Sequence, residues 1–111
     1  MRFNQSPWGT VQSEYVFPYG IYFVSTASHG GFLVPKEFAD STFSEKHLQV
    51  ANTYCDPHRI PKGYYAFEED CACLAVMCEV PKVRGNMTQK EAEDAFDRIY
   101  CFRKEDPRCP K

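Results

Sequence analysis

Two short stretches of the sequence hold the side chains best suited to chemistry. The first combines two hydroxyl groups with an imidazole, and the second is a run of three carboxylates: Thr26, Ser28 and His29, then Glu68, Glu69 and Asp70. An imidazole beside carboxylates can bind a divalent cation or act as an acid–base pair. A structural role is favoured, because a histidine in a glycine turn often hydrogen-bonds its own loop and carboxylates suit the N-terminus of a helix.

Cysteine chemistry is not predicted. Six cysteines and three histidines would supply enough zinc ligands, but no second pair completes a C-x2-C…C-x2-C pattern. A cysteine nucleophile is disfavoured as well, because three acidic residues directly before Cys71 oppose formation of a thiolate. We expect reduced thiols at all six positions: Cys55, Cys71, Cys73, Cys78, Cys101 and Cys109.

Other catalytic motifs are missing from the sequence. There is no G-x-S-x-G turn of a serine hydrolase and no lysine-containing glycine loop for a nucleotide phosphate. We therefore assign no catalytic residue, no metal and no cofactor. The sequence leans towards a protein that is not an enzyme.

Charge and hydropathy narrow the range of partners. Thirteen Lys and Arg against fifteen Asp and Glu give a net charge of -2, so no positive field attracts a phosphate backbone and direct nucleic-acid binding is not expected. No stretch approaches the apolar length of a membrane span, and the first residues lack the apolar core of a signal peptide. We expect a cytoplasmic protein without a membrane partner, folded as a single domain over residues 1–111.

The first half of the chain has the pattern of a small sheet. Residues 9–17 and 20–26 are rich in β-branched and aromatic side chains and flank the turn Pro18–Gly20, which predicts a hairpin. Gly30 and Gly31 then interrupt the pattern. They predict a tight loop in which the backbone takes a positive φ or approaches another group closely.

The second half is expected to be mainly helical. A short helix is predicted over 44–52, with a serine as its N-cap. An apolar stripe with steps of four, three and four predicts a helix over 67–78, whose first turn holds the acidic run. Thr88 and Glu91 form a capping box, and the helix that they begin is expected to run to about Cys101.

The predicted fold is therefore α+β, with an N-terminal antiparallel β-hairpin or small sheet covered by two longer helices. The core is expected to draw on both parts: Ile21, Phe23, Phe67, Leu74, Phe96 and Ile99. Because a strand exit and a helix N-terminus commonly meet at one edge of such a layer, we expect His29 to hydrogen-bond Glu69 or Asp70. On that structural role His29→Ala would lower stability by roughly 1–2 kcal/mol.

Three blocks of sequence carry a resemblance: S-P-W-G at residues 6–9, S-T-A-S-H-G-G-F at 25–32 and E-E-D-C at 68–71. Over roughly residues 6–81 the chain resembles a family of small uncharacterised domains encoded by bacterial plasmids and phages, with the helix after Thr88 outside the shared part. The resemblance implies a mobile-element protein in the cytoplasm of a bacterial host and brings no activity with it. It marks these motif positions: Trp8, Thr26, His29, Gly30, Gly31, Glu69 and Asp70.

Two functions of different classes fit these features. The first is a binding protein, an inhibitor of a host defence system such as CRISPR or restriction, that covers a basic surface of a host protein or assembly with acidic residues. Two clusters would suit this role: Glu68, Glu69 and Asp70, and Glu91, Glu93 and Asp94. The candidate binding residues are Trp8, Thr26, His29, Gly30, Gly31, Glu68, Glu69 and Asp70. The alternative is a small metal-dependent hydrolase or nuclease that uses His29 with Glu69 and Asp70.

Overall fold

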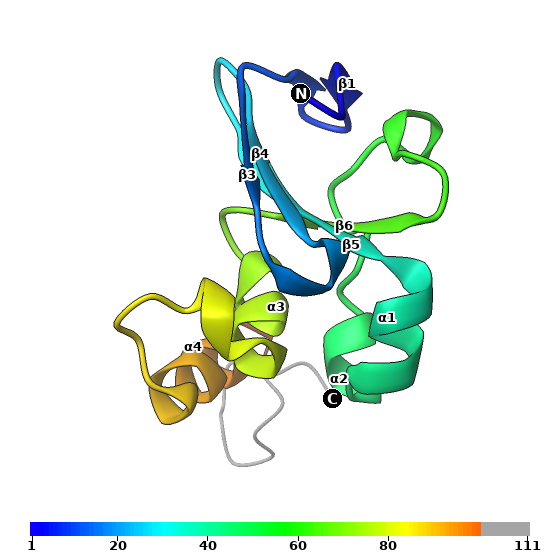
Figure 1. Ribbon diagram of the computed structural model, residues 1–111. Helices are drawn as coiled ribbons and strands as arrows, with labels where there is room; N and C mark the ends of the chain where they lie inside the picture. Colours follow the sequence, from blue (N-terminus) through cyan, green and yellow to red (C-terminus); the bar gives the residue numbers. More distant parts are fainter. Residues whose placement is uncertain (101–111) are drawn as a thin grey trace.

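Four antiparallel strands form the sheet on which the rest of the chain packs, in the order β3-β4-β5-β6 (Figure 1). The structure is a computed structural model that describes residues 1–100. Its strands are β1 (Gln5–Ser6), β2 (Gly9–Thr10), β3 (Ser13–Val16), β4 (Tyr22–Ser25), β5 (Gly30–Pro35) and β6 (Tyr64–Glu68). Its α-helices are α1 (Lys36–Thr42), α2 (Glu45–Leu48), α3 (Cys73–Glu79) and α4 (Gln89–Tyr100), and short 3-10 turns are η1 (Pro18–Gly20), η2 (Pro57–Arg59) and η3 (Pro81–Val83). The α+β fold is confirmed.

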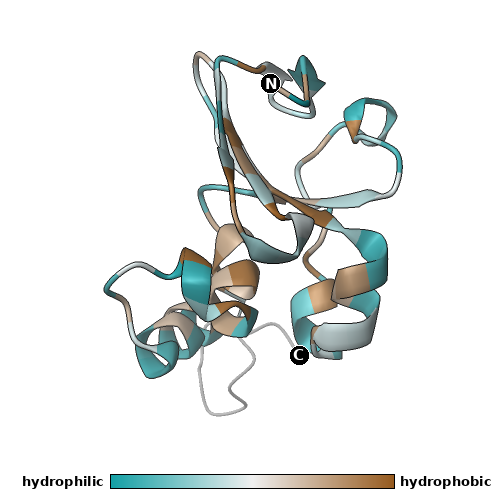
Figure 2. Cartoon of the chain, viewed as in Figure 1, coloured by the Kyte–Doolittle hydropathy of each residue, from teal (hydrophilic) through white to brown (hydrophobic). Residues whose placement is uncertain are grey.

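Alternation of side chains along the strands gives the sheet two apolar faces. Phe32 and Phe67 belong to the larger core cluster, which helices α3 and α4 complete with residues such as Phe96. Leu33 points to the opposite face, into a smaller cluster that Phe3 of the N-terminal segment helps to cover. Apolar residues are accordingly concentrated along the central strands and on the helices (Figure 2). Strand β5 is thus buried on both sides, which fixes the position of the strand end that carries Gly30.

The predicted hairpin forms, but it is shorter than the sequence pattern suggested. Strand β3 pairs with β4 over Ser13–Val16 and Tyr22–Ser25, on either side of the turn at Pro18–Gly20. Residues 9–10 instead pair with residues 5–6 in a separate two-stranded ribbon, β1–β2. This small ribbon lies beside the N-terminus, at one end of the larger sheet (Figure 1).

The helix predicted over 67–78 is wrong in its first half. Residues up to Glu68 form strand β6, in which Phe67 is paired with Phe32 of β5, and the helix begins only at Cys73. The apolar stripe is therefore divided between a strand and a helix that contribute to one core. Pairing along the whole length of β5 overrides the local helical pattern, because the strand gains both ladder hydrogen bonds and cross-strand packing.

The last helix begins as predicted. The backbone N–H of Thr88 donates to Glu91 Oε1 at 2.9 Å, and the N–H of Glu91 donates to Thr88 Oγ1 at 3.1 Å, which is a capping box. Four of the predicted core residues are buried and two are not: Ile21, Phe67, Leu74 and Phe96 are buried, Phe23 is half-buried and Ile99 is exposed. Ile99 lies on the same face of α4 as the buried Ala92 and Phe96, but it belongs to the last turn of the helix and stays exposed there.

The outer edge of β6 is covered by a side chain. Asn52, in the left-handed conformation with φ 66°, donates its N–H to the carbonyl of Ala66 at 2.7 Å. Its side-chain Oδ1 accepts the N–H of Ala66 at 2.8 Å. Asn52 therefore makes the pair of hydrogen bonds that a neighbouring strand would make at this position, and asparagine tolerates the required φ better than most residues.

Two further expectations concern the cysteines and the membrane. The four cysteines among residues 1–100 are free thiols: Cys55, Cys71, Cys73 and Cys78. Cys101 and Cys109 lie outside the residues that the structure describes. Within residues 1–100, no helix has both the length and the apolar character needed to cross a bilayer.

Candidate functional site

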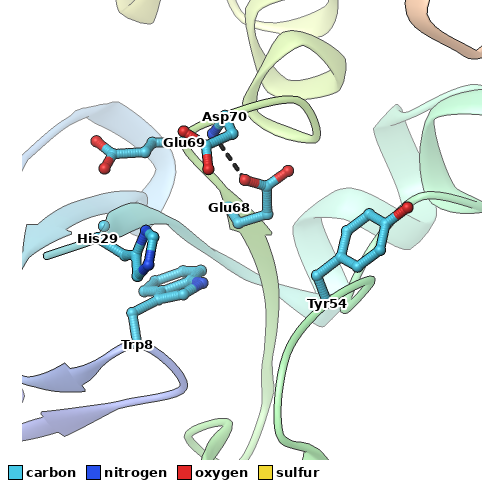
Figure 3. A pocket seen from close by; sticks show the side chains of 7 residues that line it. Trp8, His29, Tyr54, Glu68, Glu69 and Asp70 are labelled. Atoms are coloured by element: carbon cyan, nitrogen blue, oxygen red, sulfur yellow. Dashed lines mark hydrogen bonds between the residues drawn. The ribbon is translucent and has the colours of Figure 1, made fainter.

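A pocket of about 190 Å³ opens where the β1–β2 turn, the start of β5 and the end of β6 meet (Figure 3). Its lining consists of aromatic, imidazole and carboxylate side chains around one glycine: Trp8, His29, Gly30, Tyr54, Glu68, Glu69 and Asp70. Six of the eight binding residues predicted from the sequence therefore line a single pocket. Thr26 and Gly31 complete the predicted set; they do not line the pocket, but both lie against Trp8.

The two glycines are required for close approach. Neither has a positive φ, and both belong to β5, so the tight loop predicted here ends at His29. A Cβ on Gly31 would lie 2.4 Å from the carbonyl oxygen of Phe67 and 2.6 Å from the indole ring of Trp8. A Cβ on Gly30 would lie 2.6 Å from a backbone oxygen of β4. Gly31 thus lets the Trp8 ring rest on β5, and Gly30 lets the start of β5 lie close to β4.

Thr26 joins the two loops that carry the aromatic part of the pocket. Its hydroxyl lies 2.7 Å from the carbonyl oxygen of His29 and 3.2 Å from that of Trp8, and it accepts the N–H of His29 at 3.2 Å. One side chain therefore fixes the turn that presents His29 and anchors the loop that presents Trp8. Thr26 is a positioning residue for the site.

Glu68 is buried, and its carboxylate is used by the backbone. It accepts the N–H groups of Asp70 at 2.7 Å and of both Cys71 and Ala72 at 2.9 Å. These donors precede helix α3, so Glu68 satisfies the free N–H groups of the turn that leads into the helix. The dashed line in Figure 3 marks the contact with Asp70. Glu68 therefore shapes the pocket wall more than it offers a free charge.

Glu69 and Asp70 remain free at the rim of the pocket. Both are exposed, and neither carboxylate makes a hydrogen bond or ion pair with any of residues 1–100. The His29 ring, which is also exposed, makes no hydrogen bond within that part of the chain. The structure thus brings His29 to the same pocket as Glu69 and Asp70, but the predicted hydrogen bond between them is not formed. Figure 3 shows the imidazole beside the indole of Trp8 instead.

The electrostatic character of the pocket is acidic. Three carboxylates line it, and no lysine or arginine does. Burial, and then the charge of Glu68, raises the pKa of the neighbouring Cys55 thiol to about 11, although the nearby Trp8 indole opposes this rise. The same two causes raise the pKa of Cys73 to about 12. Both thiols stay protonated at neutral pH, so neither is poised as a nucleophile.

A metal site is not supported by this geometry. Among residues 1–100, no group of three or more histidine, cysteine, aspartate or glutamate side chains is arranged to hold a metal ion. The hydrolase alternative uses His29 with Glu69 and Asp70, and these three side chains line one pocket without forming such a group. The predicted hydrolase alternative therefore lacks a ligand set in this part of the chain.

The acidic run in α4 differs from the one in the pocket, because it is used within its own helix. Glu91 belongs to the capping box, Asp94 forms an ion pair with Lys90 at 2.8 Å, and Glu93 accepts from Gln89 at 3.5 Å. Such pairs are ordinary i, i+3 and i, i+4 helix contacts. Of the two predicted acidic clusters, only the one at the pocket offers carboxylates without partners.

Sequence reasoning missed a second polar cluster between α2 and α3. His47 is buried, and its Nδ1 lies 2.5 Å from Glu79 Oε2 and 2.9 Å from Ser44 Oγ. Glu79 also accepts the N–H of Ser44 at 2.7 Å and its hydroxyl at 3.0 Å. Serine and carboxylate share one ring nitrogen, while the other is buried and stands against Phe96, so the cluster is not a nucleophilic triad.

No signal in the sequence pointed to this cluster or to Tyr54. Glu79 lies 35 residues from Ser44, so their contact depends on the packing of α2 against α3. Tyr54 reaches the pocket from a loop and has a φ of 59°, which is unusual for a tyrosine. Both are products of the tertiary fold.

The comparisons with known proteins address the family and leave the activity open. No curated protein and no solved structure matches the chain. A family model described as "Domain of unknown function (DUF7007)" matches residues 2–102, well beyond the residues 6–81 of the predicted resemblance and including helix α4. Because the match covers nearly the whole chain, the protein belongs to the DUF7007 family of domains of unknown function.

Proposed function

We propose that this protein is a non-enzymatic binding protein that takes a basic side chain of a partner protein into the pocket at Trp8. The observation that carries the proposal is the pairing of an aromatic wall with unpartnered carboxylates. Trp8 and Tyr54 supply the aromatic surface, and Glu69 and Asp70 supply charges that no residue from 1 to 100 neutralises. Cations are attracted both to the face of an indole ring and to carboxylates.

The size of the pocket suits the end of one side chain. About 190 Å³ leaves room for a single guanidinium or ammonium group with part of its apolar stem, and not for a folded segment. The indole accommodates the stem, while the rim carboxylates meet the charged end. The pocket would thus act as an anchor within a wider contact, as buried arginines do in many interfaces.

The partner that we propose is a host protein or assembly with an exposed basic surface. Nucleic-acid-binding enzymes of host defence, such as CRISPR or restriction systems, have surfaces of this kind, since they must attract phosphates. The net charge of -2 and the acidic pocket suit such a target. The resemblance of the S-P-W-G and S-T-A-S-H-G-G-F blocks to domains encoded by plasmids and phages supports a mobile-element origin and a bacterial cytoplasmic location.

The experiment uses Trp8, the sole tryptophan of the chain, as a reporter inside the site. Its fluorescence is followed while a short arginine-rich peptide is added. We expect a saturable change, and we expect the double variant Glu69→Gln/Asp70→Asn to weaken binding about tenfold or more, as for two lost charge-assisted contacts.

A matched control separates the pocket from net charge. Glu37→Gln/Glu45→Gln removes the same two charges from α1 and α2, outside the pocket. Its affinity should stay within about twofold of wild type, because charges at a distance are screened by salt. An equal loss in both double variants, or an unchanged Trp8 signal during binding, would overturn the proposal.

A further inference from the structure

The outer edge of β3 has free backbone groups at two residues. The N–H of Phe17 donates to the carbonyl of Ile21 at 2.8 Å, and the register pairs Tyr15 with Phe23. Because hydrogen-bonded residues alternate along an antiparallel strand, Tyr15 also faces β4 with its backbone groups. The N–H and C=O groups of the intervening Glu14 and Val16 therefore point away from the sheet.

Among residues 1–100, no strand pairs with this edge, since β3 is the first strand in the sheet order. Residues 1–4 make no backbone hydrogen bond to β3, and Phe3 packs over one face of the sheet. Its ring packs edge-on against Tyr22 of β4 and Tyr64 of β6, with centroids 5.1 and 5.2 Å away. The contrast is with β6, whose outer edge Asn52 covers.

The side chains of this edge do not discourage pairing. Natural proteins usually protect open edges with lysine, proline or a bulge. Residues 11–17 contain no lysine, arginine or proline. Their one charge, Glu14, already accepts the N–H groups of Arg2 and Phe3 at 2.9 and 3.0 Å. Large apolar side chains lie exposed beside it, with Tyr15 60% and Val16 68% accessible.

We propose that β3 pairs with β3 of a second copy of this chain, antiparallel and about a two-fold axis at Tyr15. This register places Glu14 of each copy opposite Val16 of the other, so the outward N–H and C=O groups of both residues are satisfied. No like charges face each other, and the two Tyr15 side chains become direct cross-strand neighbours. The self-complementary register argues for a second copy as the occupant, and the result is one continuous eight-stranded sheet.

The first test measures the oligomeric state of the full chain by sedimentation over a range of concentrations. A reversible dimer is expected. Val16→Pro removes an N–H group that points outward and leaves the hydrogen bonds to β4 intact. Because the substitution is present in both copies, the dimer loses two hydrogen bonds, and its dissociation constant should rise about tenfold or more. Val16→Thr keeps the N–H and the β-branched shape and should dimerise far better than the proline variant. A protein that is monomeric up to about 1 mM would overturn the proposal.

The second test reads the register and does not depend on how the proline variant folds. Tyr15→Cys places two thiols at a non-hydrogen-bonded pair, where the Cα atoms are about 4.5 Å apart and a disulfide fits. With oxidised glutathione as the oxidant, it should give a covalent dimer above the level of wild type with its native thiols. Val16→Cys should not, because the two-fold axis separates its copies by about two residues along the strand. Equal cross-linking of both variants would overturn the register.

Discussion

Helix α3 has a carboxylate at each end, and the two carboxylates serve different purposes. Glu68, the last residue of β6, accepts three backbone N–H groups of the turn that leads into the helix, and its neighbours Glu69 and Asp70 remain without partners among residues 1–100 at the rim of a pocket. Glu79, the last residue of the helix, is enclosed with Ser44 and His47. Both regions combine histidine, carboxylate and aromatic side chains, but only the first is open to a ligand.

The difference shows that residue types alone do not identify a binding site. The histidine that does hydrogen-bond a carboxylate, His47, is buried and joins α2 to α3. The histidine that lies in the pocket, His29, makes no such bond within residues 1–100. Polar groups that satisfy one another hold the fold together, whereas groups left without partners at the surface are available for recognition.

The largest effect should come from removing Glu68, because three backbone donors depend on it. We expect Glu68→Ala to lower the free energy of unfolding by about 3 kcal/mol, since each unsatisfied N–H group in a partly buried site is costly. Urea denaturation measures the loss. Glu68→Gln keeps one acceptor oxygen and should lose less. A loss below about 1 kcal/mol in the alanine variant would show that the carboxylate does not hold the turn.

His47→Ala should have the next largest effect. It removes a buried ring that packs against Phe96 with centroids 4.7 Å apart, and it leaves Glu79 without its closest partner. We expect a loss of about 2–3 kcal/mol in the free energy of unfolding. His47→Asn can still offer an N–H near the position of Nδ1, so this variant should be more stable than His47→Ala. If the alanine variant were as stable as wild type, this cluster would not stabilise the fold, and it would no longer differ from the open pocket.

The closed cluster should also show in the pH dependence of stability. Burial raises the pKa of Glu79, but hydrogen bonds from His47 and Ser44 outweigh burial and hold it below its ordinary value of 4.5. A carboxylate with a lowered pKa stabilises the folded state above the ordinary pKa, and the contribution is lost as pH falls through the lowered value. Wild type should therefore melt at a higher temperature than Glu79→Gln, by a constant amount above pH 4.5, and the two melting temperatures should converge below that pH. A gap that widens on acidification would contradict this sign.

The smallest effect is expected for His29→Ala. The exposed ring makes no hydrogen bond with residues 1–100, so the loss predicted from the sequence is too large. We expect the free energy of unfolding to change by no more than about 0.5 kcal/mol. Thr26→Val is the useful comparison, since Thr26 holds both loops of the pocket, and it should lose more. If His29→Ala were clearly destabilised, then His29 would stabilise the fold as His47 does, and the contrast between the two histidines would be wrong.

Local signals predicted the local parts of the fold. The capping box at Thr88 and Glu91 needs only neighbouring residues, and it formed as expected. The stripe over 67–78 misled because its first residues pair with β5, more than thirty positions earlier, and long-range pairing is invisible to periodicity. The turn and hairpin at Pro18–Gly20 were likewise predicted from local sequence, although residues 9–10 of the predicted first strand pair instead with residues 5–6.

The sequence predicted most of the residues of the site, but not how their side chains are arranged. Motif positions drew attention to Trp8 and to the acidic run, and the fold brings them to one pocket. The sequence could not show that Glu68 turns inward while Glu69 stays free, because that choice depends on which backbone N–H groups lie within reach. Nor could it show Tyr54, whose left-handed backbone is set by its loop.

The hydrogen bonds that Asn52 makes with Ala66 set an upper limit on growth of the sheet. A strand that approached β6 from outside would have to displace both bonds before it could pair with Ala66, in the middle of the edge. Pairing through β3 consumes the other edge of each copy, so a dimer formed in that way presents a capped margin at both of its ends. Assembly by strand addition would then stop at two copies, and the asparagine, far from the two-fold axis, would be the residue that keeps a dimer from extending into a fibre.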